Sequence, residues 1–356
     1  MRDVRSVTVG PGVSIHEALM VLDRTGTGIV LVVDQQHHLI GTVTDGDVRR
    51  AILHGISLDE SVTVLLDFRG KKPIVAHPTT PPTERLQLMQ ERSIRHLPIL
   101  SQAGRVVELV LLSELSDKPQ SSVSAIVFAG GYGTRLRPLT ETLPKPMLPI
   151  GGRPLLERIV RSLAASGISD VRITTCFMAE KIKDHFGDGG HLGVHIRYID
   201  EEHPLGTAGA LGIIDRPEIT TLAVNGDILT DLNFQTVVDF HRDHEADMTV
   251  AVRKYEFQVE YGVVESDGIE TTGLVEKPSF QFFINAGIYV LEPAVFDYVP
   301  RGVQLDMPDL IKSLIADKRR VISFPIREYW LDVGRHDDYA QANDDFEGGK
   351  VRLELG

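Results

Sequence analysis

Residues 125–149 of this chain combine an apolar run, a glycine-rich turn and two cations at fixed positions. The apolar run 125–129 predicts a buried strand, and it leads directly into Gly-Gly-Tyr-Gly-Thr-Arg at 130–135. Lys145 follows ten residues after Arg135 and stands between two prolines. Glycines let backbone N–H groups come close to an anion, and two cations can hold a polyphosphate from its sides. The stretch therefore predicts a site for a nucleotide polyphosphate.

The glycine-rich turn differs from the two commonest phosphate-binding loops. It lacks the G-x-G-x-x-G pattern of dinucleotide-binding folds, and no G-K-[ST] follows at the spacing of a P-loop. A Gly-Gly-x-Gly sequence by itself can also be a tight loop without chemistry. The arginine that ends the turn and the lysine between prolines favour a phosphate site over that interpretation.

Two aspartates are candidates for a metal site. Asp227 follows the apolar strand predicted at 221–224, and Asp332 follows the strand-like run 329–331. Carboxylates that reach one site from separate strands suit a hard cation such as Mg²⁺, and a nucleoside triphosphate supplies the remaining oxygens. Either aspartate alone is also a common turn residue, so the metal prediction depends on the pair.

The elements that must position these residues follow a strand–helix alternation after residue 124. Predicted strands span 171–176, 195–199, 221–224 and 248–252, and predicted helices span 155–165, 179–186 and 234–244. This alternation predicts a mostly parallel sheet that helices cover on both faces. Ligands of such sheets bind at the carboxyl ends of the strands, which is where the motifs above fall.

The first 117 residues contain an internal repeat instead. A helix with a capping box at 14–17 precedes strands at 29–33 and 39–44, and the order recurs with a helix at 83–91 and strands at 97–100 and 106–112. The two copies are offset by 67 residues, which makes Thr44 equivalent to Leu111. Residues 118–124 are polar, contain proline and lack periodicity, so they predict a linker.

The composition limits the classes of partner. The 356 residues carry a net charge of −13, which argues against a nucleic-acid partner. No apolar run reaches the length that spans a membrane, and the N-terminus lacks the apolar core of a signal peptide. A single cysteine, Cys176, excludes a disulfide within the chain. We therefore expect a cytoplasmic protein that binds neither nucleic acid nor membrane.

The repeated unit resembles a pair of CBS domains, the Bateman module. The resemblance covers nearly all of residues 1–117, with repeats at about 1–57 and 68–117. It implies an α+β domain that joins the second domain, residues 125–356, through the linker. CBS pairs bind adenine nucleotides, so the resemblance implies a regulatory module.

Thr44 and Asp47 are the residues on which that regulatory site depends. In the CBS family, a Thr/Ser-x-x-Asp sequence after the second strand holds the ribose of the nucleotide, and Thr44 and Asp47 match it. The second repeat departs from the pattern with Leu111 and Glu114. At most one adenosyl-type site is implied. The alternative is that Thr44 only caps the following helix and the module only mediates dimerisation.

Residues 125–346 resemble the sugar-1-phosphate nucleotidyltransferases. Seven blocks carry the resemblance in the order of that family, namely 130–140 with 144–149, 205–210, 225–227, 261–264, 276–278, 285–289 and 330–334. The resemblance implies an α/β domain with a Rossmann-like, mixed and mostly parallel sheet of the GT-A-like kind. It also implies transfer of a nucleotide to a sugar 1-phosphate.

The resemblance assigns roles to the candidate residues. Arg135 and Lys145 would stabilise charge on the triphosphate, and the two aspartates would hold Mg²⁺. Lys277 would position the sugar phosphate, and the proline after it favours an extended backbone with a defined side-chain direction. The alternative for Lys277 is a solvated surface lysine. Further residues implied for the nucleotide are Ala129, Gly130, Gly131, Gly133, Thr134, Gly206 and Thr207, and those for the sugar phosphate are Gly262, Glu276 and Asn285.

The implied reaction is attack of a sugar 1-phosphate oxygen on the α-phosphorus of an NTP, with pyrophosphate as the leaving group. The attacking oxygen is already anionic at neutral pH, so the reaction requires neither a general base nor a covalent intermediate. Blocks 205–211 and 225–229 look most like mannose- and heptose-1-phosphate guanylyltransferases, which favours GTP over UTP or dTTP. CBS-fused relatives resemble glucosamine-1-phosphate guanylyltransferases.

We expect this chain to be an enzyme that forms a homo-oligomer. The rival interpretation is a regulatory subunit that binds nucleotides without turnover. Such subunits usually lose the arginine, the lysine or one metal aspartate, and Arg135, Lys145, Asp227 and Asp332 are all present here. The sequence therefore favours an enzyme.

Overall fold

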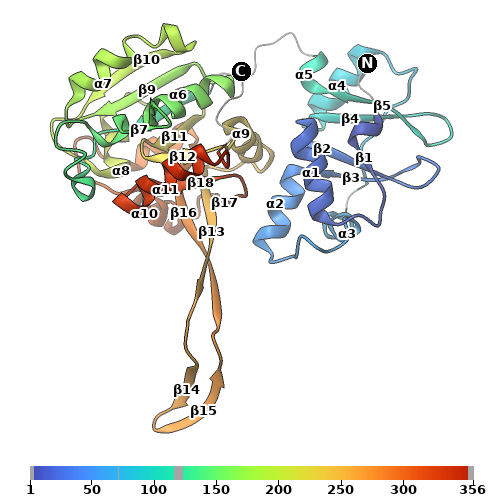
Figure 1. Ribbon diagram of the computed structural model, residues 1–356. Coiled ribbons are helices and arrows are strands. Elements are labelled where there is room, and N and C mark those ends of the chain that lie inside the picture. Colours follow the sequence, from blue (N-terminus) through green and yellow to red (C-terminus); the bar gives the residue numbers. More distant parts are fainter. Residues whose placement is uncertain (1–3, 71, 116–122, 352–356) are drawn as a thin grey trace. The chain divides into compact units, whose positions relative to one another are not determined.

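The computed structural model describes residues 4–70, 72–115 and 123–351, and the chain divides into two compact units, Met1–Ser121 and Ser122–Gly356 (Figure 1). Most of the linker predicted at 118–124 lies outside the described residues. Among the described residues, no helix combines the length and the apolarity needed to cross a membrane.

The N-terminal unit contains the same strand–strand–helix order twice. In the first half, η1 (Val4–Val7) and β1 (Thr8–Val9) precede α1 (Ile15–Thr25), β2 (Ile29–Val33), β3 (Leu39–Thr44), α2 (Asp45–Leu53) and α3 (Thr63–Arg69). In the second half, α4 (Pro82–Glu91) precedes β4 (His96–Leu100), β5 (Val106–Leu111) and α5 (Leu112–Leu115). Both strand pairs are antiparallel hairpins, and β3 and β5 begin 67 residues apart. The structure thus confirms the α+β repeat expected from the sequence.

Local signals in the sequence explain the first of these helices. Ser14 Oγ accepts from Glu17 N at 3.1 Å and Glu17 Oε2 accepts from Ser14 N at 2.8 Å, which is the capping box predicted there. The helix ends at Gly26, whose φ of +61° costs a glycine little. The apolar face of α1, with Ile15 and Leu19, packs on Val30 of β2.

The second unit is built on a mixed, mostly parallel sheet of seven strands. The strand order is β10-β9-β6-β11-β16-β13-β17. The strands are β6 (Ser124–Phe128), β9 (Asp170–Thr175), β10 (His195–Asp200), β11 (Thr221–Asn225), β13 (Met248–Gln258), β16 (Ser279–Leu291) and β17 (Val321–Ile326). Only β16 runs antiparallel to its neighbours, β11 and β13. The fold class expected from the alternation is confirmed.

Helices and short elements complete this unit. The helices are α6 (Leu155–Ala165), α7 (Ala179–Phe186), α8 (Gly206–Gly209), α9 (Phe234–Asp243), α10 (Met307–Ala316) and α11 (His336–Glu347). The single turns of 3₁₀ helix are η2 (Thr134–Leu136), η3 (Lys145–Met147), η4 (Gly190–Leu192), η5 (Ala210–Ile213) and η6 (Pro293–Tyr298). Short paired strands are β7 (Pro149–Ile150) with β8 (Arg153–Pro154), β12 (Ile228–Thr230) with β18 (Trp330–Asp332), and β14 (Val263–Asp267) with β15 (Glu270–Val275).

Both faces of the sheet are buried at its centre. Val127 of β6 and Val224 of β11 lie side by side in one apolar cluster with residues of α6, α7 and α9. Ile126 and Ala223, which point to the opposite face of the same strands, are also fully buried. Strands covered on both faces read as continuous apolar runs, which is why the sequence of 125–129 is apolar throughout.

Strands β13 and β16 continue far beyond the sheet and form a two-stranded ribbon. The sequence predicts a strand at 248–252, whereas β13 runs to Gln258 and pairs with β16 as far as Ser279. The hairpin β14–β15 closes the far end of this ribbon (Figure 1). Residues 254–283, here called the arm, have no other strand beside them, because β17 pairs with β13 only up to Arg253.

Candidate active site

The two aspartates meet at the carboxyl end of the sheet. Strand β11 runs parallel to β6 with Asn225 opposite Phe128, and Gly226 N donates to Phe128 O at 2.8 Å, which places Asp227 just beyond the strand. The short β12–β18 pair sets Ile228 opposite Asp332, and Val333 N donates to the carbonyl of Asp227 at 3.0 Å. Backbone pairing thus brings together two carboxylates that lie 105 residues apart in the sequence.

Lys145 is the positively charged residue next to these two carboxylates. Its Nζ lies 2.5 Å from Asp227 Oδ2 and 4.0 Å from Asp332 Oδ1. Prolines on both sides fix the backbone as it enters η3, and the lysine side chain is mostly buried. The structure thus places Lys145 next to both carboxylates, with one positive charge shared by two negative ones.

The donor set fits a divalent cation. Asp227 Oδ1 is buried without a hydrogen-bond partner. Burial, and then the charge of Asp227, raise the pKa of Asp332 to about 6, although Lys145 and Arg135 oppose this shift. Among the described residues, no group of three or more His, Cys, Asp or Glu side chains could hold a metal. Two carboxylates would therefore leave the other positions to nucleotide oxygens and water.

The glycine-rich turn follows β6 beside these carboxylates. Ala129 N donates to Thr174 O at 3.1 Å, which holds the start of the turn against β9. Gly133 has a φ of +63°, and a Cβ there would lie 3.0 Å from Lys145 Cβ, so this position requires glycine. Gly131, Thr134 and Arg135 are exposed at the turn, where backbone N–H groups and the guanidinium can meet an anion.

Glu201 supports two of the predicted nucleotide-binding segments at once. A Cβ on Gly130 would lie 2.6 Å from Glu201 Oε1, and Glu201 Oε2 accepts from Leu205 N at 3.0 Å. The buried carboxylate therefore joins the glycine-rich turn to the turn that begins α8. Glu201 is not among the residues predicted from the sequence, although its position directly after β10, at a carboxyl strand end, was an available signal.

Gly206 and Thr207 are fixed by the segment before α10. Gly206 has a φ of +79°, and a Cβ there would lie 2.6 Å from Leu305 O. Thr207 Oγ1 accepts from Met307 N at 2.9 Å. Close backbone packing accounts for this glycine, and the predicted contact with the nucleotide stays a prediction.

Asn285 lies on β16 close to the carboxylates. Its Oδ1 accepts from Gly287 N at 3.0 Å, and Gly287 packs so closely that a Cβ would lie 2.6 Å from Asn225 Nδ2. Asn225 Oδ1 is buried without a partner, two residues before Asp227. Burial raises the pKa of Tyr289, which also senses the Asp227 charge, to about 12. Asn225 is a second polar residue at the site that sequence reasoning did not single out.

Gly262, Glu276 and Lys277 lie on the arm. A Cβ on Gly262 would lie 2.9 Å from Glu276 Oε2, so these predicted sugar-site residues are neighbours across the ribbon. Lys277 precedes Asn285 by eight residues, which at about 3.3 Å per residue puts it about 26 Å away from Asn285, toward the far end of the ribbon. The structure therefore brings the predicted residues together as two groups, one in the body of the unit and one on the arm.

The backbone expectation for Lys277 is wrong. Its φ is +46°, in the left-handed region, whereas the following proline predicts an extended backbone. The ladder explains the difference: Val259 N donates to Pro278 O at 3.0 Å, so the chain must turn at Lys277 to pass from β15 into β16.

The sequence profile of the nucleotidyl transferase family matches residues 124–348, and the profile of the CBS domain matches residues 1–54 and 67–119. The first match covers more than half of the chain and includes the whole seven-stranded sheet. The chain belongs to the nucleotidyl transferase family. Its N-terminal unit carries the CBS-domain pair expected from the repeat.

Two curated relatives of this nucleotidyl transferase are named for one activity. The mannose-1-phosphate guanylyltransferase of Mycobacterium tuberculosis is 36% identical over 236 residues, which are 64% of this chain and 65% of the relative. The mannose-1-phosphate guanyltransferase of Candida albicans is 34% identical over 61% of this chain and 62% of its own length. The chain thus spans somewhat less than two thirds of each relative.

Solved structures agree with this family assignment. HddC from Yersinia pseudotuberculosis, crystallised with GMP-PN, superposes with a TM-score of 0.50 at 25% identity. The match covers 63% of this chain and 99% of HddC. HddC is thus matched over nearly its whole length, whereas more than a third of this chain lies outside the match. This chain also carries the CBS-domain pair at its N-terminus.

In the CBS pair, Thr44 and Asp47 form a capping box. Asp47 Oδ2 accepts from Thr44 N at 2.8 Å and from Thr44 Oγ1 at 2.7 Å, and Thr44 Oγ1 accepts from Asp47 N at 3.3 Å. Asp47 Oδ1 is paired with Arg50. Glu114 makes the corresponding bond in the second repeat, to Leu111 N at 3.0 Å. These contacts support the capping interpretation of Thr44, while a ribose-binding role stays a prediction.

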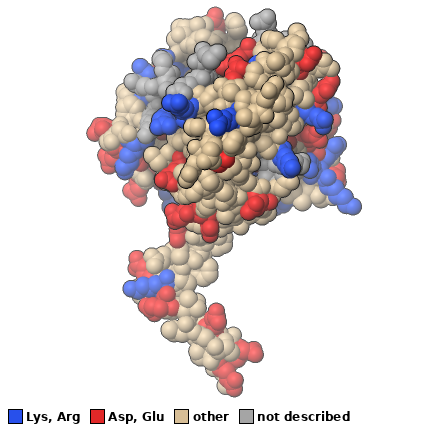
Figure 2. Space-filling view, turned by 90° about the vertical axis from the view of Figure 1, so that its right-hand side faces the viewer, with Lys and Arg blue, Asp and Glu red and all other residues tan. Residues whose placement is uncertain are grey.

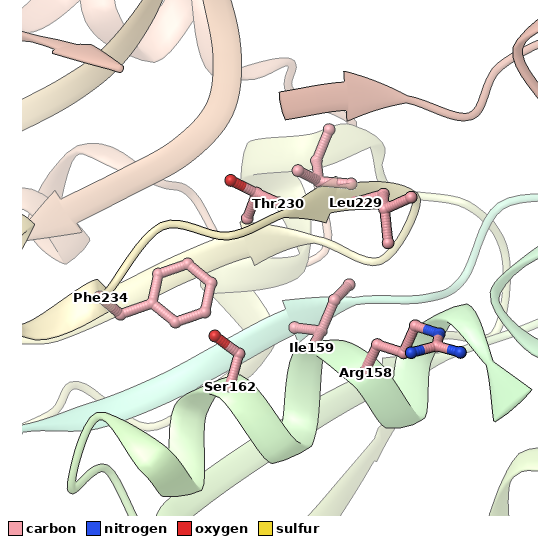
Figure 3. Close-up of a pocket in the computed structure, with 7 residues that line it drawn as sticks. Arg158, Ile159, Ser162, Leu229, Thr230 and Phe234 are labelled. Carbon is pink, nitrogen blue, oxygen red and sulfur yellow. The ribbon is translucent and has the colours of Figure 1, made fainter. Parts of the chain in front are cut away.

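A small cavity lies between α6 and β12 (Figure 3). Figure 3 shows Arg158, Ile159 and Ser162 on the helix, with Leu229, Thr230 and Phe234 across from them. Its volume of about 10 Å³ holds one water molecule and no substrate. This cavity is a packing feature of the interior.

Proposed function

We propose that the second unit transfers GMP from GTP to a sugar 1-phosphate and releases pyrophosphate. The observation that carries the proposal is the pair Asp227–Asp332, with Lys145 at 2.5 Å from the first carboxylate, beside the glycine-rich turn. The names of the relatives and the GMP-PN bound to HddC support guanine over other bases. The relatives also favour mannose 1-phosphate as the acceptor.

Mg²⁺ is the proposed metal, held by Asp227 Oδ1 and the Asp332 carboxylate. A bound Mg²⁺ would neutralise charge on the α-phosphate. The unpaired oxygen of Asp227 supports this assignment, and so does the raised pKa of Asp332, because burial and the Asp227 charge disfavour an ionised carboxylate that a bound cation would stabilise.

The protein's own groups perform the rest of the work. The turn at 130–135 offers backbone N–H groups to the triphosphate, and Arg135 at its end opposes the charge that develops as pyrophosphate leaves. Lys145 lies on the carboxylate side of the same phosphates. Because the sugar phosphate oxygen is an anion, the site must hold two polyanions together at the attack angle, and no residue is needed to remove a proton.

Pyrophosphate release tests the proposal. The full chain is incubated with Mg²⁺, each of four NTPs and a panel of sugar 1-phosphates, with the Asp227→Asn variant as control. We expect release with GTP and mannose 1-phosphate above every other pair, and loss of it in the variant. Release with UTP or dTTP alone would move the assignment to another base, and no release with any pair would support the nucleotide-sensing subunit.

Regulation by the CBS pair is a separate part of the proposal. An adenine nucleotide held near Thr44 and Asp47 would alter turnover by shifting a conformational or oligomeric equilibrium. The matching sequence at these two residues supports it, and their capping contacts show what such a ligand would have to displace.

A further inference from the structure

The arm has one aromatic face. Tyr255 pairs with Phe282 and Phe257 pairs with Phe280, so these four rings lie on the same side of the ribbon. Each ring residue is between 43% and 56% exposed. The opposite side presents mainly polar residues, with Glu256 opposite Gln281 and Gln258 opposite Ser279.

The apolar surface of the arm is large enough for a stable interface. Ten large apolar side chains of the arm are exposed, namely Tyr255, Phe257, Tyr261, Val264, Ile269, Leu274, Val275, Phe280, Phe282 and Phe283. At about 200 Å² for a large side chain and about half of it exposed, they offer about 1,000 Å² over both sides of the arm, because strand neighbours such as Phe282 and Phe283 point to opposite sides. Two such arms together offer about 2,000 Å², which is within the 1,200–2,000 Å² of a typical specific interface. A two-stranded ribbon is also only marginally stable in water by itself.

The arm also carries one of the two groups of site residues. Gly262 and Glu276 are neighbours near its far end, and Lys277 follows Glu276. The body of the unit holds the carboxylates, Lys145 and the glycine-rich turn. A sugar phosphate needs both groups, because the resemblance assigns Asn285 of the body to it as well as Glu276 and Lys277 of the arm.

The ladder favours an arm that stays extended. Pairing between β13 and β16 is continuous from Val252–Asn285 to Gln258–Ser279, and the only register shift among the described pairs lies between Val250 and Val252, inside the sheet. Folding the arm back onto its own site would break ladder hydrogen bonds near Arg253. Delivery to a second copy keeps every pair intact.

We propose that the arm docks on a second copy of this chain and completes the partner's active site with Glu276 and Lys277. The exchange is reciprocal, so that a two-fold dimer covers both aromatic faces and contains two complete sites. The assignment of Glu276 and Lys277 to the sugar phosphate rests on the proposed function. The arm's docking on a second copy rests on the exposed aromatic face and the intact ladder.

Complementation between two inactive variants tests the exchange. Lys277→Ala damages the arm group and Asp227→Asn damages the body group, and each alone is expected to lose about 10²–10³ in turnover. The two full-length chains carry different tags, are co-expressed, and are purified through both tags. Each mixed dimer would contain one intact site, so we expect about half of the wild-type turnover. Lys254→Ala, a lysine on the arm outside the family motif, is the matched control and should retain wild-type turnover.

Two results would overturn the exchange. Turnover of the mixed dimer no higher than the mean of the two parents would mean that each arm serves its own chain. Failure of the two tagged chains to copurify would mean that no second copy is bound. A wild-type chain without turnover would instead refute the proposed function. In that case a measurement that does not depend on activity is needed to show whether the arm binds a second copy.

Cross-linking provides that measurement. Cys176 is the only cysteine of the chain, and Cys176→Ser removes it. Tyr261→Cys then introduces one cysteine on the arm, which is labelled with the photo-cross-linker maleimide–benzophenone. Chains labelled with ¹⁴N and ¹⁵N are co-refolded or co-expressed, irradiated and mapped by mass spectrometry. We expect links that join an arm of one isotope to catalytic-unit peptides of the other. Links only within one isotope would overturn the proposal, and Ile315→Cys, on exposed α10, controls for random collision.

Discussion

Two carboxylates and one lysine determine the chemistry at the smallest scale. Asp227 Oδ2 forms an ion pair with Lys145 Nζ, and Asp227 Oδ1 is buried without a hydrogen-bond partner. Asp332 Oδ1 lies 4.0 Å from the same Nζ. A single positive charge is too little for this pair together with a triphosphate. Arg135, whose charge opposes the rise in the pKa of Asp332, is the second positive charge near the pair.

Asp332→Asn should stabilise the ligand-free protein in a pH-dependent way. The pKa of Asp332 is about 6 in the folded state and near 3.8 when unfolded, so wild-type stability falls as the pH rises from about 4 to 6. The asparagine removes this loss. Because Asp332 is half exposed, we expect a rise in Tm of only about 2 °C at pH 8 and a clearly smaller rise at pH 4.5, where most of the loss has not yet occurred. Equal shifts at both pH values, in thermal melts without metal or nucleotide, would contradict the assigned cause.

Arg135→Ala should lose turnover without losing the fold. The exposed guanidinium makes no packing contribution that the site depends on, and its removal takes away one charged donor from the triphosphate. The expected loss is about 10²–10³ in kcat. The matched control is Arg137→Ala, an exposed arginine two residues further on, which should retain most turnover. Near-wild-type kcat in Arg135→Ala, with unchanged thermal melts, would refute the role of Arg135.

At the scale of elements, the sheet and the aspartates could be predicted from the sequence, and the arm could not. Apolar runs such as 125–129 and 221–224 encode strands buried on both faces, so their carboxyl ends located Asp227. Residues 253–258 carry a strand pattern too, but local periodicity does not say that a strand lacks neighbours. Glu201 and Asn225 were missed because their importance comes from contacts with Gly130 and Gly287, far away in the sequence.

Gly130→Ala tests whether Glu201 links the glycine-rich turn to the turn that begins α8. The added Cβ would lie 2.6 Å from Glu201 Oε1, so the carboxylate must move and give up the hydrogen bond from Leu205 N. Because this bond holds the turn that begins α8 in place, we expect the KM for GTP to rise about tenfold, which corresponds to about 1.4 kcal/mol of binding free energy. Gly131→Ala, where a Cβ meets no atom within 4 Å, should raise the KM less. Equal effects of both substitutions would show that Glu201 does not transmit the change.

At the scale of the whole molecule, the chain combines two units with separate buried cores. Val30 and Val43 belong to a core in the N-terminal unit, and Val127 and Val224 belong to one in the catalytic unit. Proteins with more than one domain commonly unfold in more than one step, so the units offer two separate readouts of ligand binding. The proposed arm exchange has a further consequence for unfolding. It makes the unfolding transition of the second unit depend on protein concentration.

Ligands should therefore shift the two unfolding transitions selectively in calorimetry of the full chain. GTP with Mg²⁺ at 100 times its Kd should stabilise the catalytic unit by about 2.7 kcal/mol and leave the N-terminal transition in place. An adenine nucleotide held by Thr44 and Asp47 should do the reverse, and Asp47→Ala should abolish that shift while lowering the N-terminal transition, because the capping box is lost. An N-terminal transition that millimolar AMP and ATP leave unchanged in the wild type would refute the adenosyl site, and Thr44 would then act only as the cap of α2.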